Sequence, residues 1–364
     1  MGRAVSDTER LICSLPTKLG GLNIPNPIKL CSKEYEWSQK LTLSLTEKVI
    51  KQSLYEEDSP EEIMERHNQI LREIKAEKKS IQKEMHDSIY AGLDDETKRS
   101  INLASEKGAS IWLNTLPIKS MGYALNKQEF LDAIALRYNF SIQGMACHCA
   151  CGSKNSIDHA LICRLGGYTI MRHNEVRNIE ADLLKEVCRD VQVEPALIPL
   201  SGQQFPASTN HQDMARLDVS ARGLWAPMEK AFFDVRIFHP NASSNRSKPL
   251  PQLYRAHENE KKRMYNQRII EVEHASFTPL VFSTSGGESP ECLRFHRRLA
   301  SLLSSRRNET YAETITYIRR KVRFCILRTT LIAIRGYRKP KMQGVVPIPL
   351  HQVDISVSEA AHSR

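Results

Sequence analysis

Apolar residues recur at helical spacing through the segment 60–90. They follow Ser59-Pro60-Glu61-Glu62, which places a serine at the N-cap, a proline at the first helical position and a glutamate at the third. This pattern predicts one long amphipathic helix, and the segment 127–138 predicts another. Residues 1–45 carry turn signals around 15–27 and indicate a connector. We therefore expect residues 1–145 to be a helical region, with a buried stripe of Ile63, Ile70, Ile74, Ile81, Met85 and Ile89.

The pattern changes to mixed α/β after residue 163. Apolar positions at helical spacing predict helices over 172–191 and 308–336, the second capped by Asn308 and ended by Gly336. Short apolar runs predict strands over 196–200, 215–221, 231–238 and 278–283, with a polar helix over 252–273 before the last strand. Residues 340–364 lack a pattern and are expected to form a loose tail.

The basic charge of the chain is concentrated near its C-terminal end. Lys and Arg number 52 against 42 Asp and Glu, a formal net charge of +10. Between residues 294 and 340, 13 basic residues accompany two acidic ones. Such a concentration favours a polyanionic partner, although an ordinary solvated helix face is the alternative. The residues expected to contact nucleic acid are Arg319, Arg320, Lys321 and Arg323 of the C-terminal helix, together with Arg172 and His173.

Three cysteines and a histidine have the spacing of a zinc site. Cys149 and Cys151 flank one alanine, and His159 and Cys163 are four residues apart, so on a helix they share a face. Three thiolates and one imidazole complete a tetrahedral shell, which predicts a structural Zn2+ site with no open position. Cys147 and His148 lie just upstream and could compete as ligands. The alternative is a set of buried thiols in a turn.

Two acidic residues lie in neighbouring predicted strands. Asp218 belongs to the strand 215–221, and Asp234 shares the strand 231–238 with Arg236 on the same side. Two carboxylates at one sheet end suit Mg2+ or Mn2+, which can activate a water for attack on a phosphodiester. Lys262 and Tyr265 share a helix face and could supply a cation. Capping or ion-pairing acids remain the alternative.

The motifs together resemble the C-terminal region of non-LTR retrotransposon proteins that carry a zinc knuckle and a restriction-enzyme-like endonuclease. The resemblance rests on the order of Cys149-x-Cys151-Gly152, His159-Ala160-Leu161-x-Cys163, Arg172-His173-Asn174, Leu217-Asp218-Val219, Phe233-Asp234-Val235-Arg236 and Lys262-x-x-Tyr265. It implies a post-polymerase region (1–145), a knuckle (146–167), a restriction-endonuclease-like α/β domain (168–306), a basic helix (307–339) and a tail (340–364). A glutamate of the preceding helix, Glu175 or Glu180, is expected to join the metal site.

The implied function is metal-dependent nicking of target DNA in the nucleus, which primes reverse transcription, with element RNA as a further partner and no membrane association. The chain lacks a Tyr-x-Asp-Asp motif, so we expect it to follow a polymerase that it does not contain. Leu217 replaces the usual proline, and Arg236 replaces the strand lysine and cannot act as a base. Lys261 or Lys262 must then provide the cation. Rival hypotheses are a catalytically inactive nucleic-acid-binding remnant and a zinc-stabilised protein-interaction scaffold.

Overall fold

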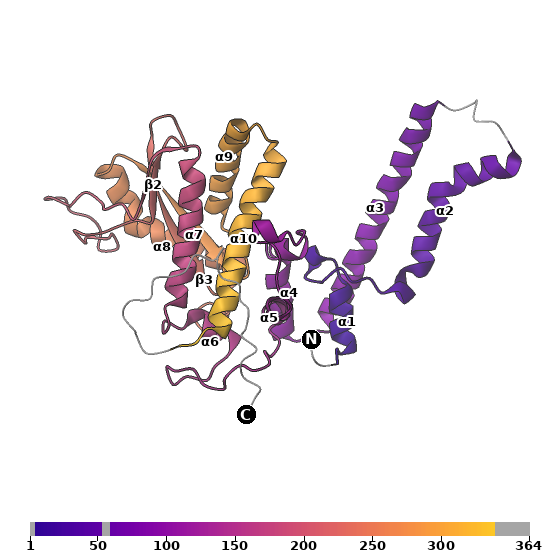
Figure 1. Ribbon diagram of the computed structural model, residues 1–364, viewed down its shortest axis with the longest axis horizontal. Coiled ribbons are helices and arrows are strands. Elements are labelled where there is room, and N and C mark those ends of the chain that lie inside the picture. Colours follow the sequence, from indigo (N-terminus) through magenta and orange to yellow (C-terminus); the bar gives the residue numbers. More distant parts are fainter. Residues whose placement is uncertain (1–3, 53–58, 339–364) are drawn as a thin grey trace. The chain divides into compact units, whose positions relative to one another are not determined.

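The computed structural model describes residues 4–52 and 59–338. The chain divides into two compact units, Met1–Ser105 and Glu106–Arg364 (Figure 1). This boundary falls inside the region 1–145 that we predicted as one helical segment. The predicted tail, 340–364, lies outside the described residues. Within the described part of the chain, every helix is too short or too polar to cross a lipid bilayer.

The first unit is helical. It contains α1 (Asp7–Ser14), a 3-10 turn η1 (Thr17–Leu19), α2 (Pro27–Lys51), α3 (Pro60–Ala91) and α4 (Asp95–Ser105). The long helix predicted over 60–90 is confirmed as α3, and Ser59 and Glu62 form its capping box. The expectation of a connector over 1–45 is wrong, because Asn26 caps α2 and Pro27 occupies its first position. The Asn-Pro pair that we interpreted as a turn therefore starts a helix.

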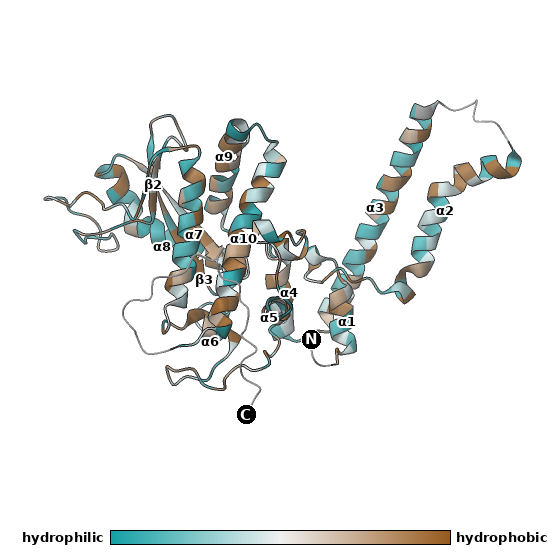
Figure 2. Ribbon diagram, viewed as in Figure 1, coloured by the Kyte–Doolittle hydropathy of each residue, from teal (hydrophilic) through white to brown (hydrophobic). Residues whose placement is uncertain are grey.

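Helices α2 and α3 contact each other through polar side chains. The indole of Trp37, 2% exposed, donates a 2.9 Å hydrogen bond from Nε1 to Glu77, which also pairs with Lys33 at 3.1 Å. Hydrophobic and hydrophilic residues are mixed along both helices (Figure 2). The pattern is that of amphipathic helices, each with one face against its neighbour.

The second unit is built around a four-stranded mixed sheet. Its strands are β1 (Arg189–Val193), β2 (Val219–Arg222), β3 (Lys230–Phe238) and β4 (Ser276–Ser283), in the order β1-β2-β3-β4. The first three are antiparallel, whereas β4 is parallel to β3 and is reached through helix α8 (Leu250–Glu271). A parallel pair requires such a crossover. The predicted mixed α/β class is therefore confirmed.

The two faces of the sheet bury different clusters. Phe233 and Val235 of β3 pack in the cluster that includes residues of α7 (Tyr168–Lys185), α9 (Pro290–Arg307) and α10 (Tyr311–Arg335). Phe232 packs with Tyr265 and Ile269 of α8. Because successive strand residues face opposite sides, β3 is sandwiched between helices on both faces.

Several predicted elements shift or were missed. The helix predicted over 172–191 is confirmed as α7, but α7 ends at Lys185 and strand β1 takes up the last residues of the predicted range. The strand predicted over 196–200 is wrong, because Ala196 forms only an isolated bridge with Arg216. Helix α9 was missed although Ser289 and Pro290 mark its start. Thr310 is the N-cap of α10, whereas Asn308 ends α9 in a left-handed conformation.

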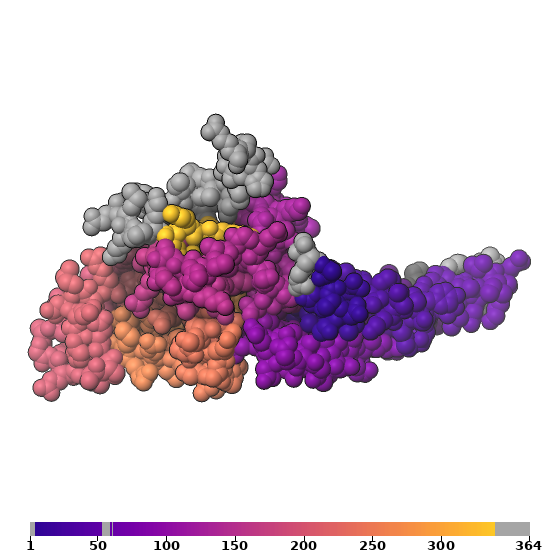
Figure 3. All heavy atoms as spheres, turned by 90° about the horizontal axis from the view of Figure 1, so that it is seen from below, coloured from indigo at the N-terminus to yellow at the C-terminus, as the bar shows by residue number. Residues whose placement is uncertain are grey.

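The zinc-type motif lies in a short irregular segment with small helices around it. Before it come the 3-10 turns η3 (Ile111–Leu113) and η4 (Lys119–Met121) and helix α5 (Lys127–Tyr138); within it is α6 (Ile157–Ile162). Leu161 of α6 packs with Ala333 and Ile334 of α10. In the space-filling view, the magenta surface of this part of the chain adjoins the yellow surface of α10 (Figure 3).

A buried ionic network ties α7, α9 and α10 together. The imidazole of His296 contacts Glu180 through Nε2 at 2.9 Å and Glu288 through Nδ1 at 2.8 Å. Arg323 of α10 pairs with Glu288 at 2.9 Å. Burial opposes the charge on His296, but Cys292 and Glu180 raise its pKa well above the ordinary 6.5. Two carboxylates are thus balanced by two cations inside the core.

Replacing His296 with Ala should lower the free energy of unfolding by about 3–5 kcal/mol, because Glu180 and Glu288 would be left partly uncompensated in the core. The raised pKa determines how this stabilisation depends on pH. The contribution of His296 to the free energy of unfolding is fully present below pH 6.5 and is lost as pH rises through the pKa of His296 in the folded protein. Denaturant unfolding of wild type and variant between pH 6 and pH 9 tests both points. His67 is exposed, so His67→Ala is the control. A stability difference between wild type and His296→Ala that grew toward pH 9 would contradict this assignment.

Candidate functional site

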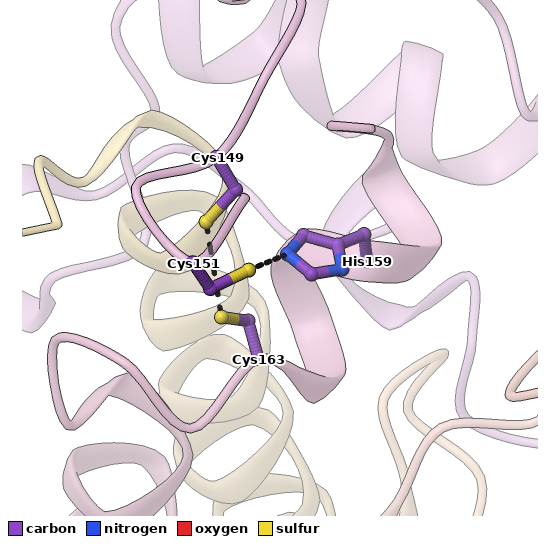
Figure 4. Close-up of side chains that lie close together, drawn as sticks. All are labelled: Cys149, Cys151, His159 and Cys163. Atoms are coloured by element: carbon purple, nitrogen blue, oxygen red, sulfur yellow. Dashed lines mark hydrogen bonds between the residues drawn. The ribbon is translucent and has the colours of Figure 1, made fainter. Parts of the chain in front are cut away.

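The predicted zinc ligands come together in the structure. Cys149 and Cys151 lie in a turn closed by a 2.9 Å hydrogen bond from the Gly152 amide to the Cys149 carbonyl, with Gly152 at φ +88°. His159 lies in the short helix α6, and Cys163 is its C-cap (Figure 4). One ligand atom from each of the four residues lies within 4.8 Å of the others. The local spacing in the sequence was therefore sufficient to identify this cluster.

The distances suit a tetrahedral metal ion. The sulfurs of Cys149 and Cys163 are 3.8 Å apart, and the sulfur of Cys151 is 3.3 Å from His159 Nε2. A tetrahedron with metal–sulfur bonds of about 2.3 Å has sulfur–sulfur edges of about 3.8 Å. Hydrogen bonds from Ser153 lower the pKa of Cys151 to about 6, which favours the thiolate that a metal requires. The cluster could therefore hold a metal ion.

The upstream competitors do not join the cluster. Cys147 and His148 are exposed, and His148 forms a backbone bridge with Lys154. A second compact group, Glu288, Cys292 and His296, also has atoms within 4.8 Å of one another. Glu288 and His296 are already engaged in the ionic network with Arg323, and Cys292 lies one helical turn before His296, which explains their proximity without a metal.

The cluster is linked to the sheet through a buried histidine. Asp158, the residue before the predicted ligand His159, contacts His239 Nε2 at 2.8 Å. His239 directly follows β3, and its Nδ1 lies 2.8 Å from the hydroxyl of Thr284, which directly follows β4. We name this the Asp158–His239–Thr284 link. Sequence reasoning missed it because the three residues are far apart along the chain.

Asp218 caps an amide of the neighbouring strand. It directly precedes β2, and continuing the register of β2 against β3 by one residue places it across from Asp234. Its Oδ2 accepts a 2.6 Å hydrogen bond from the backbone amide of Val235. His173 Nε2 lies 3.1 Å from the same oxygen and 3.0 Å from the Val235 carbonyl. Because a carbonyl only accepts, this nitrogen carries the hydrogen, and His173 donates to both.

Asp234 is buried beside a lysine of α8. Its Oδ2 is 2.7 Å from Lys261 Nζ, with side-chain exposures of 7% and 15%. The ammonium of Lys261 also lies 5.7 Å from the ring centre of Tyr265. Burial, together with the charge of Asp218, raises the pKa of Asp234 to about 6, although Lys261 and His173 oppose the shift. The two acids are therefore close enough to influence each other.

The acidic pair is not a preformed cluster like that of the cysteines. Among the described residues, the groups of three or more metal-ligating side chains within 4.8 Å do not include Asp218 or Asp234. His173, which contacts Asp218, and Lys261, which contacts Asp234, come from helices packed on opposite faces of the sheet. Asp218 lies close to the plane of the sheet, where its carboxylate takes the place of a backbone acceptor for Val235.

The predicted role of Lys262 requires a correction. Its Nζ pairs with Glu291 at 2.7 Å, and it is Lys261, the open alternative, that reaches Asp234. Adjacent helical residues point about 100° apart, so only one of them can face the sheet. Tyr265 lies one turn after Lys261 and is buried against Phe277. Arg236 is partly exposed, and its charge acts on Lys261.

One of the two candidate helix glutamates is engaged elsewhere in the core. Glu180 is fully buried and pairs with His296, so its candidacy as a metal ligand is wrong. Glu175 is partly buried on α7, and its proposed role stays a prediction. The side chain that α7 brings to Asp218 is that of His173. His173 was predicted to contact nucleic acid, whereas its ring is directed toward Asp218.

Two of the predicted nucleic-acid contacts are wrong because the side chains are buried. Arg172, 3% exposed, donates to the Leu161 carbonyl at 2.9 Å, and Arg323, also 3% exposed, pairs with Glu288. Arg319, Arg320 and Lys321 are partly exposed, and their predicted role stands as a prediction.

Helix α10 is a core helix whose basic residues are largely paired. Arg328 pairs with Glu129 at 3.1 Å, and Arg335 pairs with Asp132 at 2.6 Å. Its apolar face packs against α7 and α9. Helix α10 therefore exposes less positive charge than its number of basic residues suggests.

No family model matches the chain, and no curated protein matches it significantly.

Proposed function

We propose that this chain is the DNA endonuclease region of a non-LTR retrotransposon protein, which nicks target DNA by metal-dependent hydrolysis of a phosphodiester. The observation that carries the proposal is the buried pair of Asp234 and Lys261 next to Asp218, at the centre of a mixed sheet. Carboxylate oxygens are the ligands that Mg2+ and Mn2+ prefer. In this proposal the protein acts in the nucleus, and the nick primes reverse transcription of element RNA.

The order of the elements supports the restriction-enzyme-like part of the proposal. Helix α7 is followed by β1, by Asp218 directly before β2, by β3 with Asp234, by α8 with Lys261 and then by β4. This is the order that the resemblance requires: a helix, two acidic strands and a downstream lysine. Fold alone does not establish an activity, so the proposal depends on the side chains.

The donor set fits a hard divalent ion. Asp234 Oδ2 is buried and accepts no well-aligned hydrogen bond, although the Lys261 ammonium lies 2.7 Å away. Asp218 uses Oδ2 for Val235 and His173, which leaves its other oxygen for a ligand. When bound there, Mg2+ or Mn2+ would lower the pKa of a water and neutralise charge on the phosphate.

The residues of the chain then have separate tasks. Asp234 and Asp218 would hold the ion, and His173 is a positioning residue because its Nε2–H fixes the Asp218 carboxylate. Lys261 would orient the attacking water or the phosphate through its ammonium. Arg236 would bind a phosphate oxygen, since a guanidinium pairs with phosphate but does not give up its proton.

The cysteine–histidine cluster is proposed to hold structural Zn2+. All four ligand positions are filled by protein side chains, which leaves no place for a reacting water. The knuckle and the half-exposed Arg319, Arg320 and Lys321 would contribute to nucleic-acid binding.

A non-catalytic nucleic-acid-binding remnant is the second candidate. It is favoured by one observation: both acids already have protein partners. Asp218 contacts Val235 and His173, and Asp234 contacts Lys261. In this alternative the acids are structural, and the protein binds DNA without cutting it. Incubation of the purified chain with supercoiled plasmid and Mg2+ or Mn2+ separates the two, because only the nuclease yields nicked circles.

Lys261→Met should reduce plasmid nicking by about 100-fold or more, as expected for loss of a charged group that acts on the reacting phosphate. Lys262→Met is the matched control, because it removes the same charge one residue further along α8 from a side chain that pairs with Glu291. Initial nicking rates at saturating DNA measure the difference. Equal rates for the two variants would show that Lys261 takes no part in cleavage.

A further inference from the structure

The acids of the proposed nuclease site are already surrounded by positive charge. Lys261 contacts Asp234 at 2.7 Å, and His173 contacts Asp218 at 3.1 Å. Arg236 adds a second permanently charged group, close enough that its charge acts on Lys261. The negative charge of the two carboxylates is therefore offset before any metal arrives.

A divalent ion entering this arrangement would meet uncompensated repulsion. It would bring two further positive charges next to an ammonium in a largely buried place, where screening by water is weak. The ion and Lys261 also need the same Asp234 oxygen, because the ammonium lies 2.7 Å from Oδ2. The two cations therefore cannot occupy this position together.

We propose that Lys261 holds the cation position at Asp234 in the free protein, and that the metal enters only when a phosphate of bound nucleic acid draws the ammonium away. The proposal rests on the proposed function, and it assigns Lys261 a second task, the control of metal entry. It predicts that the free chain binds Mg2+ or Mn2+ weakly and that nucleic acid and metal bind cooperatively.

The lysine is suited to such an exchange. Its ammonium is a point charge on a flexible four-carbon chain, and it can pair with carboxylate or phosphate by side-chain rotation alone. The Lys261 side chain is 15% exposed, so it is accessible from solvent, and its contact with Asp234 lacks good hydrogen-bond alignment. Arg236, two residues along β3 on the same side as Asp234, could bind the same phosphate.

Coupling of this kind is reciprocal. If phosphate promotes metal binding, the metal must strengthen binding of the nucleic acid by the same factor. The arriving phosphate also supplies the negative charge that the site lacks for a divalent ion. Metal is then acquired together with substrate, and the free protein does not carry a loaded, reactive centre.

Binding of Mn2+ to the full, zinc-loaded chain at pH 8 tests the proposal, with free Mn2+ followed by electron paramagnetic resonance. Lys261→Met should bind Mn2+ at least tenfold more tightly than wild type, whereas Lys262→Met should match wild type. Adding Asp234→Asn to Lys261→Met should abolish the gain. Lys261→Gln, checked by circular dichroism and zinc content, serves as a second variant if Lys261→Met does not fold.

A second measurement follows Mn2+ uptake in the presence of duplex DNA. Wild type with DNA should take up one more Mn2+ than Asp234→Asn with the same DNA, which corrects for ions bound by the DNA itself. Equal Mn2+ affinities of wild type, Lys261→Met and Lys261→Gln would overturn the proposal, and nicking by wild type would then leave the nuclease function intact. If the variants bind Mn2+ more tightly but wild type does not nick plasmid, the nuclease function is rejected. The competition between Lys261 and the metal ion for Asp234 is then still supported.

Discussion

Asp234→Asn should abolish plasmid nicking while DNA binding survives. The amide keeps the size of the side chain but removes the charge that would hold the metal and pair with Lys261. We expect a loss of more than about 100-fold, because even groups that only support metal ligands are worth 10–100-fold. Nicking of supercoiled plasmid and DNA retention in a gel at low salt provide the two measurements.

Asp182→Asn is the control for this experiment, because Asp182 is an exposed acid on α7 that pairs only locally with Lys185. Full nicking by Asp234→Asn would remove Asp234 from the proposed reaction. If wild type itself leaves plasmid intact with both Mg2+ and Mn2+, the non-catalytic remnant becomes the better interpretation.

Cys149→Ser should release the metal of the cysteine–histidine cluster and unfold the knuckle. Wild type is expected to contain about one Zn2+ per chain, and structural zinc contributes about 10–16 kcal/mol of binding free energy in small zinc-finger peptides. Few other single changes in this chain should have so large an effect on stability. Metal content and thermal unfolding, each with and without a chelator, measure it.

Cys147→Ser is the matched control, because Cys147 is an exposed cysteine two residues away that lies outside the cluster. It should keep its zinc and its unfolding temperature. Equal zinc loss in the two variants would place Cys147 among the ligands, and a wild-type chain free of zinc would contradict the assignment.

Features encoded by neighbouring residues could be predicted from the sequence. The capping box of α3, the apolar run of β3 and the spacing of Cys149, Cys151, His159 and Cys163 are each contained in one short stretch of sequence, so local geometry determines them. Helix α2 was missed because the Asn26-Pro27 pair signals both turns and helix starts. Local ambiguity of this kind is resolved only by packing.

Features that depend on tertiary partners could not be predicted. Whether Lys261 or Lys262 faces Asp234 depends on which side of α8 packs on the sheet. The basic charge of α10 suggested a surface helix, but its partners Glu129, Asp132 and Glu288 lie elsewhere in the sequence. A count of charges along the chain cannot show which of them are neutralised inside the fold.

The Asp158–His239–Thr284 link limits how this part of the chain can be divided. Arg172 of α7 and Arg338, which follows α10, donate hydrogen bonds to the carbonyls of Leu161 and Ala160 in α6, so the knuckle is bound to its surroundings at several points. A shortened chain that begins at residue 168 would leave His239 without its carboxylate and expose the surface on which α6 packs. The segment 146–167 and the sheet should therefore be kept together in any recombinant protein. A protein in which the two are separated should be insoluble.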